Sequence, residues 1–162
     1  MAEPGGDLAA ALTIEVTPFA AADAAGLADA ANRELRSRYG PFGAPPPLPS
    51  DFEEPNGVFL VARQDGRAVA CGGMRRLEDG VAEIRRMYTV PELRGRGLAA
   101  RLLRQLEIHA RRFGYRAMRL ETGWLQPDAL SLYVNAGYRV IPCYGEFNDR
   151  ESVCMEKTLV GG

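Results

Sequence analysis

The sequence has 162 residues, of which 46% are hydrophobic and 25% charged, and its formal net charge is −1 at pH 7. This length supports one domain with its own core, and the composition excludes a disordered or fibrous chain. No run of about 18 apolar residues occurs, so we expect no transmembrane helix and no membrane partner. The N-terminus does not resemble a secretory signal, so we expect a cytoplasmic protein with reduced thiols.

The near-zero net charge hides an uneven distribution along the chain. Arginines are in excess over residues 75–139, and acids are in excess elsewhere. A basic middle within a neutral chain favours a compact anionic ligand over a nucleic acid, which usually requires a basic domain. The alternative is that these arginines lie on solvent-exposed faces of helices and strands and bind no ligand. The single histidine, His109, has no metal-ligand spacing around it, so we predict no metal site.

The first part of the chain predicts a strand, a helix and a long loop. Residues 12–16 alternate in polarity as a strand does. Asp23 is a candidate cap for a helix that runs to about Arg38. The proline-rich segment Gly40–Gly57 then predicts a stiff loop with one helical turn near residues 50–53.

Two Asp-Gly pairs predict a three-stranded antiparallel meander over residues 58–90. The first pair is Asp65-Gly66 and the second is Asp79-Gly80, and each separates two runs of apolar and β-branched residues. Asp-Gly readily supplies the positive φ angles of a type I′ turn. Both turns are therefore predicted to be of this type.

The second half of the chain alternates helices and strands. We predict helices at 97–113 and 127–135 and strands at 117–122, 138–143 and 152–159. Because a helix joins the strand at 81–90 to the next strand, these two should run parallel. The expected fold class is α+β, with a mixed, mostly antiparallel sheet of about seven strands, one parallel βαβ crossover and helices on both faces.

The most informative segment is a glycine-rich turn that joins a strand to a helix, Arg94-Gly95-Arg96-Gly97-Leu98-Ala99. Its glycines allow a ligand to approach the backbone closely. The first N–H groups of the helix lack internal partners, and the helix dipole favours an anion there. The turn therefore predicts a pyrophosphate site, to which Arg94 and Arg96 add charge and Arg101 could add a further phosphate contact. A plain glycine turn before a core helix is the alternative.

Other phosphate-binding classes fit this turn less well. A nucleotide-hydrolysing P-loop needs Gly-Lys-Ser/Thr, and the only lysine is Lys157. The spacing Gly95-x-Gly97-x-x-Ala100 formally fits a dinucleotide-binding oxidoreductase, with Glu121 on the next strand. That rival is weaker because no further βαβ units follow the turn.

Two motifs together resemble the GNAT superfamily of N-acetyltransferases. Residues 94–99 match the family signature Arg/Gln-x-x-Gly-x-Gly/Ala, and Ala129–Tyr138 is similar to its Ala-x-x-Leu-Tyr-x-x-x-Gly-Phe/Tyr segment. The clear resemblance covers residues 81–159. It implies a single acetyltransferase domain over residues 1–162, of which we expect about the first eleven to be flexible.

The resemblance implies an enzyme that transfers acetyl from acetyl-CoA to a primary amine by direct attack in a ternary complex. The amides of residues 94–99 would hold the CoA pyrophosphate, and a bulge in the fourth strand would expose backbone to the pantetheine. The residues expected along that exposed backbone are Met87, Tyr88, Thr89 and Val90. The partner would be a small-molecule or peptide amine, and a homodimer is compatible with this reading. A non-catalytic acyl-CoA sensor is the alternative.

Amine acetylation needs a base for the acceptor and an acid for the leaving thiolate. A lysine-like ammonium has a pKa of ~10 and must lose a proton before it attacks. Glu83 resembles the catalytic glutamate of the histone-modifying branch of the family, and Glu121 on the neighbouring strand is the other candidate base. Tyr133 matches the family tyrosine beside the CoA sulfur and would protonate the thiolate. Salt bridges for the glutamates and core packing for Tyr133 are the structural alternatives.

The loops Gly40–Gly57 and Gly145–Glu151 are expected to recognise the acceptor. Six of their carboxylates would converge and favour a cationic acceptor. These acids are Asp51, Glu53, Glu54, Glu146, Asp149 and Glu151. Solvated loop acids without a binding role are the alternative.

Overall fold

The computed structural model describes residues 12–40 and 47–160, which form a seven-stranded sheet of order β1-β2-β3-β4-β5-β7-β6. Only the pair β4–β5 is parallel. The strands are β1 (Leu12–Val16), β2 (Val58–Gln64), β3 (Arg67–Glu78), β4 (Val81–Thr89), β5 (Ala117–Gly123), β6 (Arg139–Ile141) and β7 (Ser152–Thr158). The helices are α2 (Ala22–Tyr39), α3 (Leu98–Arg112) and α4 (Pro127–Asn135), with short 3-10 turns η1 (Pro49–Phe52) and η2 (Pro91–Leu93).

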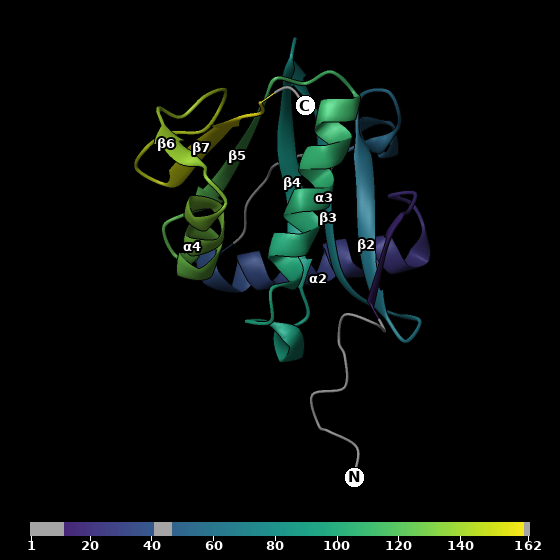
Figure 1. The fold of residues 1–162 in the computed structure, drawn as a ribbon. Helices are drawn as coiled ribbons and strands as arrows, with labels where there is room; N and C mark the ends of the chain where they lie inside the picture. The colour runs from purple at the N-terminus through teal and green to yellow at the C-terminus, as the bar shows by residue number, and fades with distance from the viewer. Residues whose placement is uncertain (1–11, 41–46, 161–162) are drawn as a thin grey trace.

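The helices cover both faces of the sheet, which confirms the predicted α+β class. In Figure 1, α3 and α4 lie on one face and α2 crosses the other. Helix α3 buries an apolar face against the sheet, where Leu102, Leu103 and Leu106 are fully buried. On the α2 face, the rings of Phe19, Phe52 and Phe59 pack together with centroids 4.9–5.3 Å apart. These two cores fix β4 between two helical layers.

Two local predictions about α2 and its surroundings have different outcomes. Gly40 ends α2 with φ 77°, as expected. Asp23 is not the cap, because the cap position is Ala21 and no side chain bonds the helix start. The carboxylate of Asp23 instead lies 2.5 Å from the guanidinium of Arg63 on β2, which draws it away from the helix amides.

The predicted flexible segment 1–11 and loop residues 41–46 lie outside the described residues.

The two Asp-Gly turns also differ from each other. Asp65 and Gly66 both have positive φ, 50° and 81°, so the type I′ prediction is confirmed there. At the second turn only Gly80 has a positive φ, and the β3–β4 pairing slips by one residue between Arg76 and Glu78. The second turn is therefore a bulged hairpin, and the type I′ prediction is wrong because β3 carries one extra residue.

A second bulge, in β4, determines where the sheet opens. Cys71 pairs with Tyr88 and Gly73 with Arg85, so β4 carries one extra residue between these pairs. Arg86 occupies the bulge with φ 61°, a left-handed conformation that is uncommon outside glycine. Only residues 81–83 of β4 pair with β5, at residues 117–119. Beyond that point β5 continues beside β7. From residue 84 onward, the edge of β4 that faces β5 has no strand partner among the described residues, while the other edge stays paired with β3.

The only lysine of the chain anchors β7 to the core beneath α3. Lys157 Nζ donates to Glu107 Oε1 at 2.9 Å, and the hydroxyl of Tyr138 donates to Glu107 Oε2 at 2.9 Å. Glu107 is 5% exposed, so these donors take the place of the water that would otherwise solvate its carboxylate. A buried carboxylate that loses its cation is costly because neither water nor another charge replaces it.

Lys157→Met should therefore lower the free energy of unfolding by about 3 kcal/mol, since it leaves the Glu107 charge unpaired in the core. Urea denaturation measures this loss. Arg67→Met is the matched control, because the pair Arg67–Glu92 has a similar distance of 2.7 Å but is more than half exposed. The control should cost at most about 1 kcal/mol. Equal losses in the two variants would show that Lys157 has no special role.

Candidate active site

The glycine-rich turn presents a row of free backbone amides at the start of α3. Gly95 and Gly97 have φ angles of 79° and 83°, and a Cβ atom added to either would meet no atom within 4 Å. The amides of residues 95–100 donate no hydrogen bond to any residue in the described part of the chain. The first turn of α3 contains no acidic residue. Open space, free N–H groups and a helix N-terminus together make an anion-binding surface.

The three arginines near the turn have different partners. Arg96 is exposed and Arg101 half-buried, and within residues 12–40 and 47–160 neither forms an ion pair. Arg94 donates from Nη1 and Nη2 to the carboxylate of Glu34 at 2.8 and 2.6 Å, and from Nε to Thr89 O at 2.9 Å. These hydrogen bonds lower the pKa of Glu34. Arg94 thus ties the turn to α2, and Arg96 and Arg101 supply the cationic side chains open to an anion.

The predicted pantetheine contacts lie just after the bulge of β4. Met87 packs against the α3 core and Tyr88 against the α2 core, while Thr89 is buried. Val90 N donates to Val69 O at 2.9 Å, which keeps this end of β4 attached to β3. The side chains of this segment are thus fixed by packing, and its backbone borders the opening between β4 and β5.

Tyr133 lies on α4, a helix that starts at Pro127 and is followed by Gly137 with φ 97°. The side chain is 5% exposed, and its ring packs edge-on against Tyr138 at 5.7 Å. Its hydroxyl makes no hydrogen bond to the residues that the structure describes. Burial raises the pKa of Tyr133, so the phenol keeps its proton at neutral pH. Only a protonated phenol can act as an acid.

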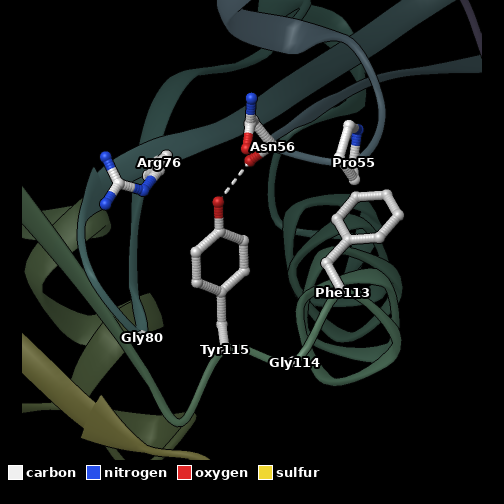
Figure 2. A pocket seen from close by; sticks show the side chains of 7 residues that line it. All are labelled: Pro55, Asn56, Arg76, Gly80, Phe113, Gly114 and Tyr115. Carbon is white, nitrogen blue, oxygen red and sulfur yellow. Dashed lines mark hydrogen bonds between the residues drawn. The ribbon is translucent and has the colours of Figure 1, made fainter.

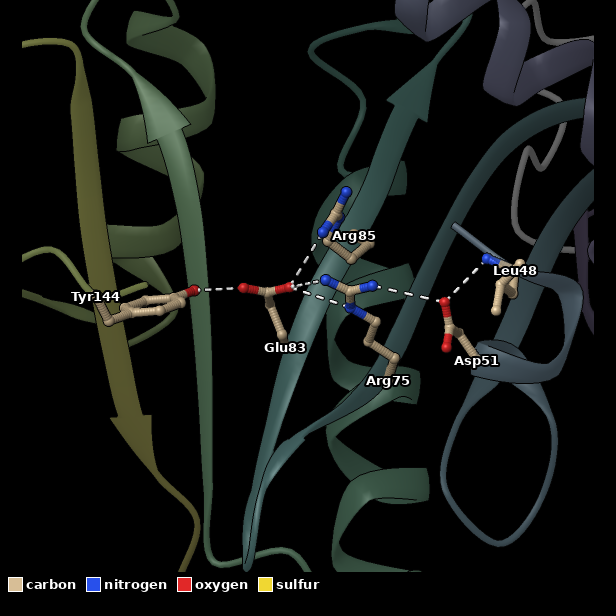
Figure 3. Close-up of polar contacts among 6 residues, drawn as sticks. All are labelled: Leu48, Asp51, Arg75, Glu83, Arg85 and Tyr144. Carbon is tan, nitrogen blue, oxygen red and sulfur yellow. Dashed lines mark hydrogen bonds and ion pairs between the residues drawn. The ribbon is translucent and has the colours of Figure 1, made fainter. Parts of the chain in front are cut away.

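Glu83, the first candidate base, is held in an ion-pair network on the α2 face of the sheet. Figure 3 shows the contacts that run across the sheet from Tyr144 to Asp51. Arg75 Nη2 and Arg85 Nη1 each lie 3.2 Å from Glu83 Oε1, and the hydroxyl of Tyr144 donates to Oε2 at 2.8 Å. With 2% exposure, the carboxylate has both oxygens engaged and little access to an acceptor. This is the salt-bridged arrangement that the sequence left open.

Glu121, the second candidate base, is less constrained. It is half-buried on β5, and Ser152 Oγ donates to its Oε1 at 2.8 Å. Desolvation raises the pKa of Glu121, and the nearby charge of Glu83 raises it further, against the hydrogen bond from Ser152 and the charge of Arg85. A carboxylate with a raised pKa accepts protons more readily near neutral pH. Of the two candidates, Glu121 therefore has the environment of a base.

The structure adds two residues that no sequence motif indicated. Tyr144 follows the predicted last-but-one strand, and Arg75 was expected only as part of a hairpin. Neither lies in a recognisable motif, and their shared partner Glu83 is 61 and 8 residues away in sequence. Only the pairing of β3 with β4 and the return of β7 beside β5 bring these side chains to one face.

Three of the six loop carboxylates expected to converge have partners of their own in the structure. Asp51 accepts from Leu48 N at 2.9 Å and faces Arg75 at 3.5 Å. Glu54 pairs at 2.8 Å with Arg112, which ends α3. Asp149 accepts from Cys143 N at 3.1 Å within its own loop. Asp51 and Glu54 thus face arginines, and the convergence of the six acids stays a prediction.

A shallow hollow of about 250 Å³ lies beside the C-terminal end of α3 (Figure 2). It is lined by Pro55, Asn56, Arg76, Gly80, Phe113, Gly114 and Tyr115. Phe113 and Gly114 follow the C-terminus of α3, whereas the glycine-rich turn precedes its N-terminus. No predicted site residue lines this hollow.

The remaining reactive side chains show no catalytic arrangement. Burial raises the pKa of Cys71 to about 12, and burial lowers the pKa of His109. Across residues 12–40 and 47–160, no three His, Cys, Asp or Glu side chains gather as a metal would require. No helix in the same ranges is long and apolar enough to cross a membrane.

A mixed sheet that opens beyond a short parallel pair, beside a glycine-rich helix start, is the architecture of an acyltransferase. The model of the acetyltransferase (GNAT) family matches residues 27–138, and the chain belongs to this family. It is therefore an acyltransferase, which contradicts both the dinucleotide-binding oxidoreductase and the non-catalytic sensor.

Individual relatives agree with this assignment. An IAA acetyltransferase of Azospirillum brasilense is 38% identical over 108 residues, which cover 65% of this chain and 71% of the relative. A solved structure from Klebsiella pneumoniae, assigned to the acyl-CoA N-acyltransferases, is 30% identical with a TM-score of 0.77 over 92% of this chain and 98% of its own. The structure of yncA from Salmonella typhimurium with its cofactor acetyl-CoA is 19% identical, has a TM-score of 0.70, and covers 92% and 94% of the two chains.

Proposed function

We propose that this enzyme transfers acetyl from acetyl-CoA to a primary amine, by direct attack of the amine within a ternary complex. The observation that carries the proposal is the row of free amides at residues 95–100, which lies beside the unpaired edge of β4. A diphosphate fits the row of free amides, because its oxygens accept hydrogen bonds from successive N–H groups. An amide-containing chain such as pantetheine fits the unpaired edge of β4, because its amides can form hydrogen bonds with an exposed strand.

The residues of the turn would bind the cofactor and position it. The amides from Gly95 to Ala99 bind the pyrophosphate, because the expected Arg94 amide already donates to Pro91 O at 3.3 Å, and Arg96 and Arg101 add charge around it. The backbone of residues 87–90 pairs with the pantetheine and directs the thioester toward the bulge at Arg86. Backbone N–H groups at this opening stabilise the oxyanion that forms during attack. Positioning of this kind supplies much of the rate enhancement of a two-substrate reaction.

Proton transfer is assigned to Glu121 and Tyr133. Glu121 removes a proton from the acceptor ammonium, either directly or through water. The amine nitrogen then forms a bond to the thioester carbon, the carbon–sulfur bond breaks, and the nitrogen loses its second proton to water. Tyr133 gives its proton to the departing thiolate and regains one from solvent. Glu83 has a supporting role, because its two oxygens are occupied by Arg75, Arg85 and Tyr144.

The test is a thiol-release assay with acetyl-CoA and a panel of polyamines, amino acids, aminoglycosides and peptides. We expect amine-dependent release of CoA thiol and competition by CoA but not by NAD. Acetyl transfer only to hydroxyl acceptors, or no release with any amine, would contradict the proposal. Mass spectrometry of the product shows which atom carries the acetyl group.

The assignment of the base predicts a pH dependence. A base works in its deprotonated form, so kcat should fall as pH decreases through the pKa of Glu121. Because burial raises this pKa, the fall should begin above the pH at which an ordinary glutamate titrates. Glu121→Gln should lower kcat by roughly 10²-fold and abolish this acidic limb. Glu83→Gln is the control and should keep the limb, whereas loss of the limb in that variant alone would make Glu83 the base.

A further inference from the structure

Three arginines lie close to one another at the β4 bulge. Arg75 lies opposite Glu83 in the β3–β4 pairing, Arg85 lies opposite Gly73, and Arg86 occupies the bulge itself. Burial lowers the pKa of Arg86, and the charges of Arg85 and Arg75 lower it further. The guanidinium groups are therefore close enough to repel one another at the point where β4 leaves β5.

The carboxylates of the described residues leave one of these arginines without a partner. Arg75 and Arg85 share a single oxygen of Glu83, and Arg75 also faces Asp51 at 3.5 Å. Arg86 is half-buried, yet it forms no side-chain hydrogen bond or ion pair with any residue of the described chain. The Cys71 thiol near it does not compensate, because burial raises the pKa of this thiol to about 12. A half-buried guanidinium without an anion is unfavourable, so its presence points to an anionic ligand.

We propose that the acceptor amine also carries a carboxylate, which Arg86 binds with the help of Arg85. This inference rests on the proposed acetyl transfer and names the substrate class of that same site. A guanidinium fits a carboxylate because its N–H groups can donate two parallel hydrogen bonds. Arg86 lies in the bulge beside the opening, so the amine and the carboxylate must be only a few bonds apart. The acceptor is therefore a small amino acid rather than a polyamine.

The same charges explain how such an acceptor becomes reactive. Positive charge close to an ammonium favours its neutral form and lowers its pKa. An amino acid bound by Arg86 would thus hold its amine in a field that promotes proton loss to Glu121. A polyamine has no carboxylate to pair with Arg86, so it would leave that guanidinium without an anion and add positive charge beside it. This proposal therefore replaces the cationic preference expected from the loop acids.

Matched substrates test this inference without changing the protein. The thiol-release assay is run with the twenty amino acids, with the carboxamide of each one that reacts, and with spermidine. We expect kcat/KM to be at least roughly ten-fold higher for the acid than for its amide, because the amide leaves Arg86 unpaired. The α-ammonium group of an amino acid carboxamide has a lower pKa than that of the free acid, so the carboxamide has more of the reactive neutral amine. A higher kcat/KM for the acid would therefore be found in spite of its less reactive amine. Equal or better turnover of the amide or of spermidine would overturn the inference and leave the proposed function intact.

A variant pair locates the effect at Arg86. Arg86→Gln should raise KM for the amino acid roughly ten-fold, and should leave KM for acetyl-CoA and for the amide unchanged. Arg76→Gln is the control and should change none of these values, because Arg76 pairs with Asp79 at the far hairpin. Calorimetry with the N-acetylated product gives a readout without turnover and should show weaker binding to Arg86→Gln. Equal effects on acid and amide would overturn the inference, whereas no thiol release from any amine would overturn the proposed function itself.

Discussion

Gly97→Ala should weaken CoA binding by roughly ten-fold or more, measured by calorimetry at low salt. The substitution places a Cβ atom where the structure has open space beside the free amides, and a bound pyrophosphate would need that space. Affinity should also decrease with added salt in the wild type, because part of the binding is electrostatic.

Gly66→Ala is the matched control for this prediction. Gly66 has φ 81° against 83° for Gly97, and a Cβ atom at either position meets no atom within 4 Å. The two variants should therefore lose similar stability, about 1 kcal/mol, from the strained left-handed backbone. Only Gly97→Ala should lose CoA affinity. Equal CoA affinity in the two folded variants would exclude the turn as the pyrophosphate site.

Tyr133→Phe should lower kcat by roughly 10²-fold, the usual contribution of a general acid, while acetyl-CoA affinity changes little. The variant keeps the ring that packs on Tyr138 and removes only the hydroxyl. Burial raises the pKa of Tyr133, so the wild-type phenol stays protonated over the whole pH range of the assay.

Tyr138→Phe separates the acid from the packing in this experiment. Its hydroxyl is also buried, but it donates to Glu107 in the core. We expect this variant to lose stability in urea denaturation and to keep kcat. A similar fall of kcat in both variants would reduce Tyr133 to a packing residue.

The sequence predicted the elements whose signals are local. The glycines at 95 and 97 predicted a helix start, and α3 begins directly after them at Leu98. Asp65-Gly66 formed the predicted turn, because Asp-Gly alone satisfies both positive φ angles. Strand β6 is shorter than its pattern suggested, since only residues 139–141 pair with β7.

The features that could not be predicted depend on contacts between distant residues. Arg94 is bound by Glu34, which is 60 residues away, and nothing near either residue indicates this partner. Arg86 adopts a positive φ without being glycine, because pairing of β3 with β4 imposes the bulge there. The environment that distinguishes Glu121 from Glu83 likewise arises only when β4, β5 and β7 come together.

The bulge in β4 has a consequence for the cost of ligand binding. Because the extra residue is part of the strand pairing, β4 and β5 are already apart in the free protein. A ligand that enters between them breaks no β-sheet hydrogen bonds and spends no free energy on separating strands. Preorganisation of this kind lets a larger share of the contact energy appear as affinity. Removing the extra residue should let β4 and β5 pair further along their length. A ligand would then have to break those hydrogen bonds, and it would bind more weakly.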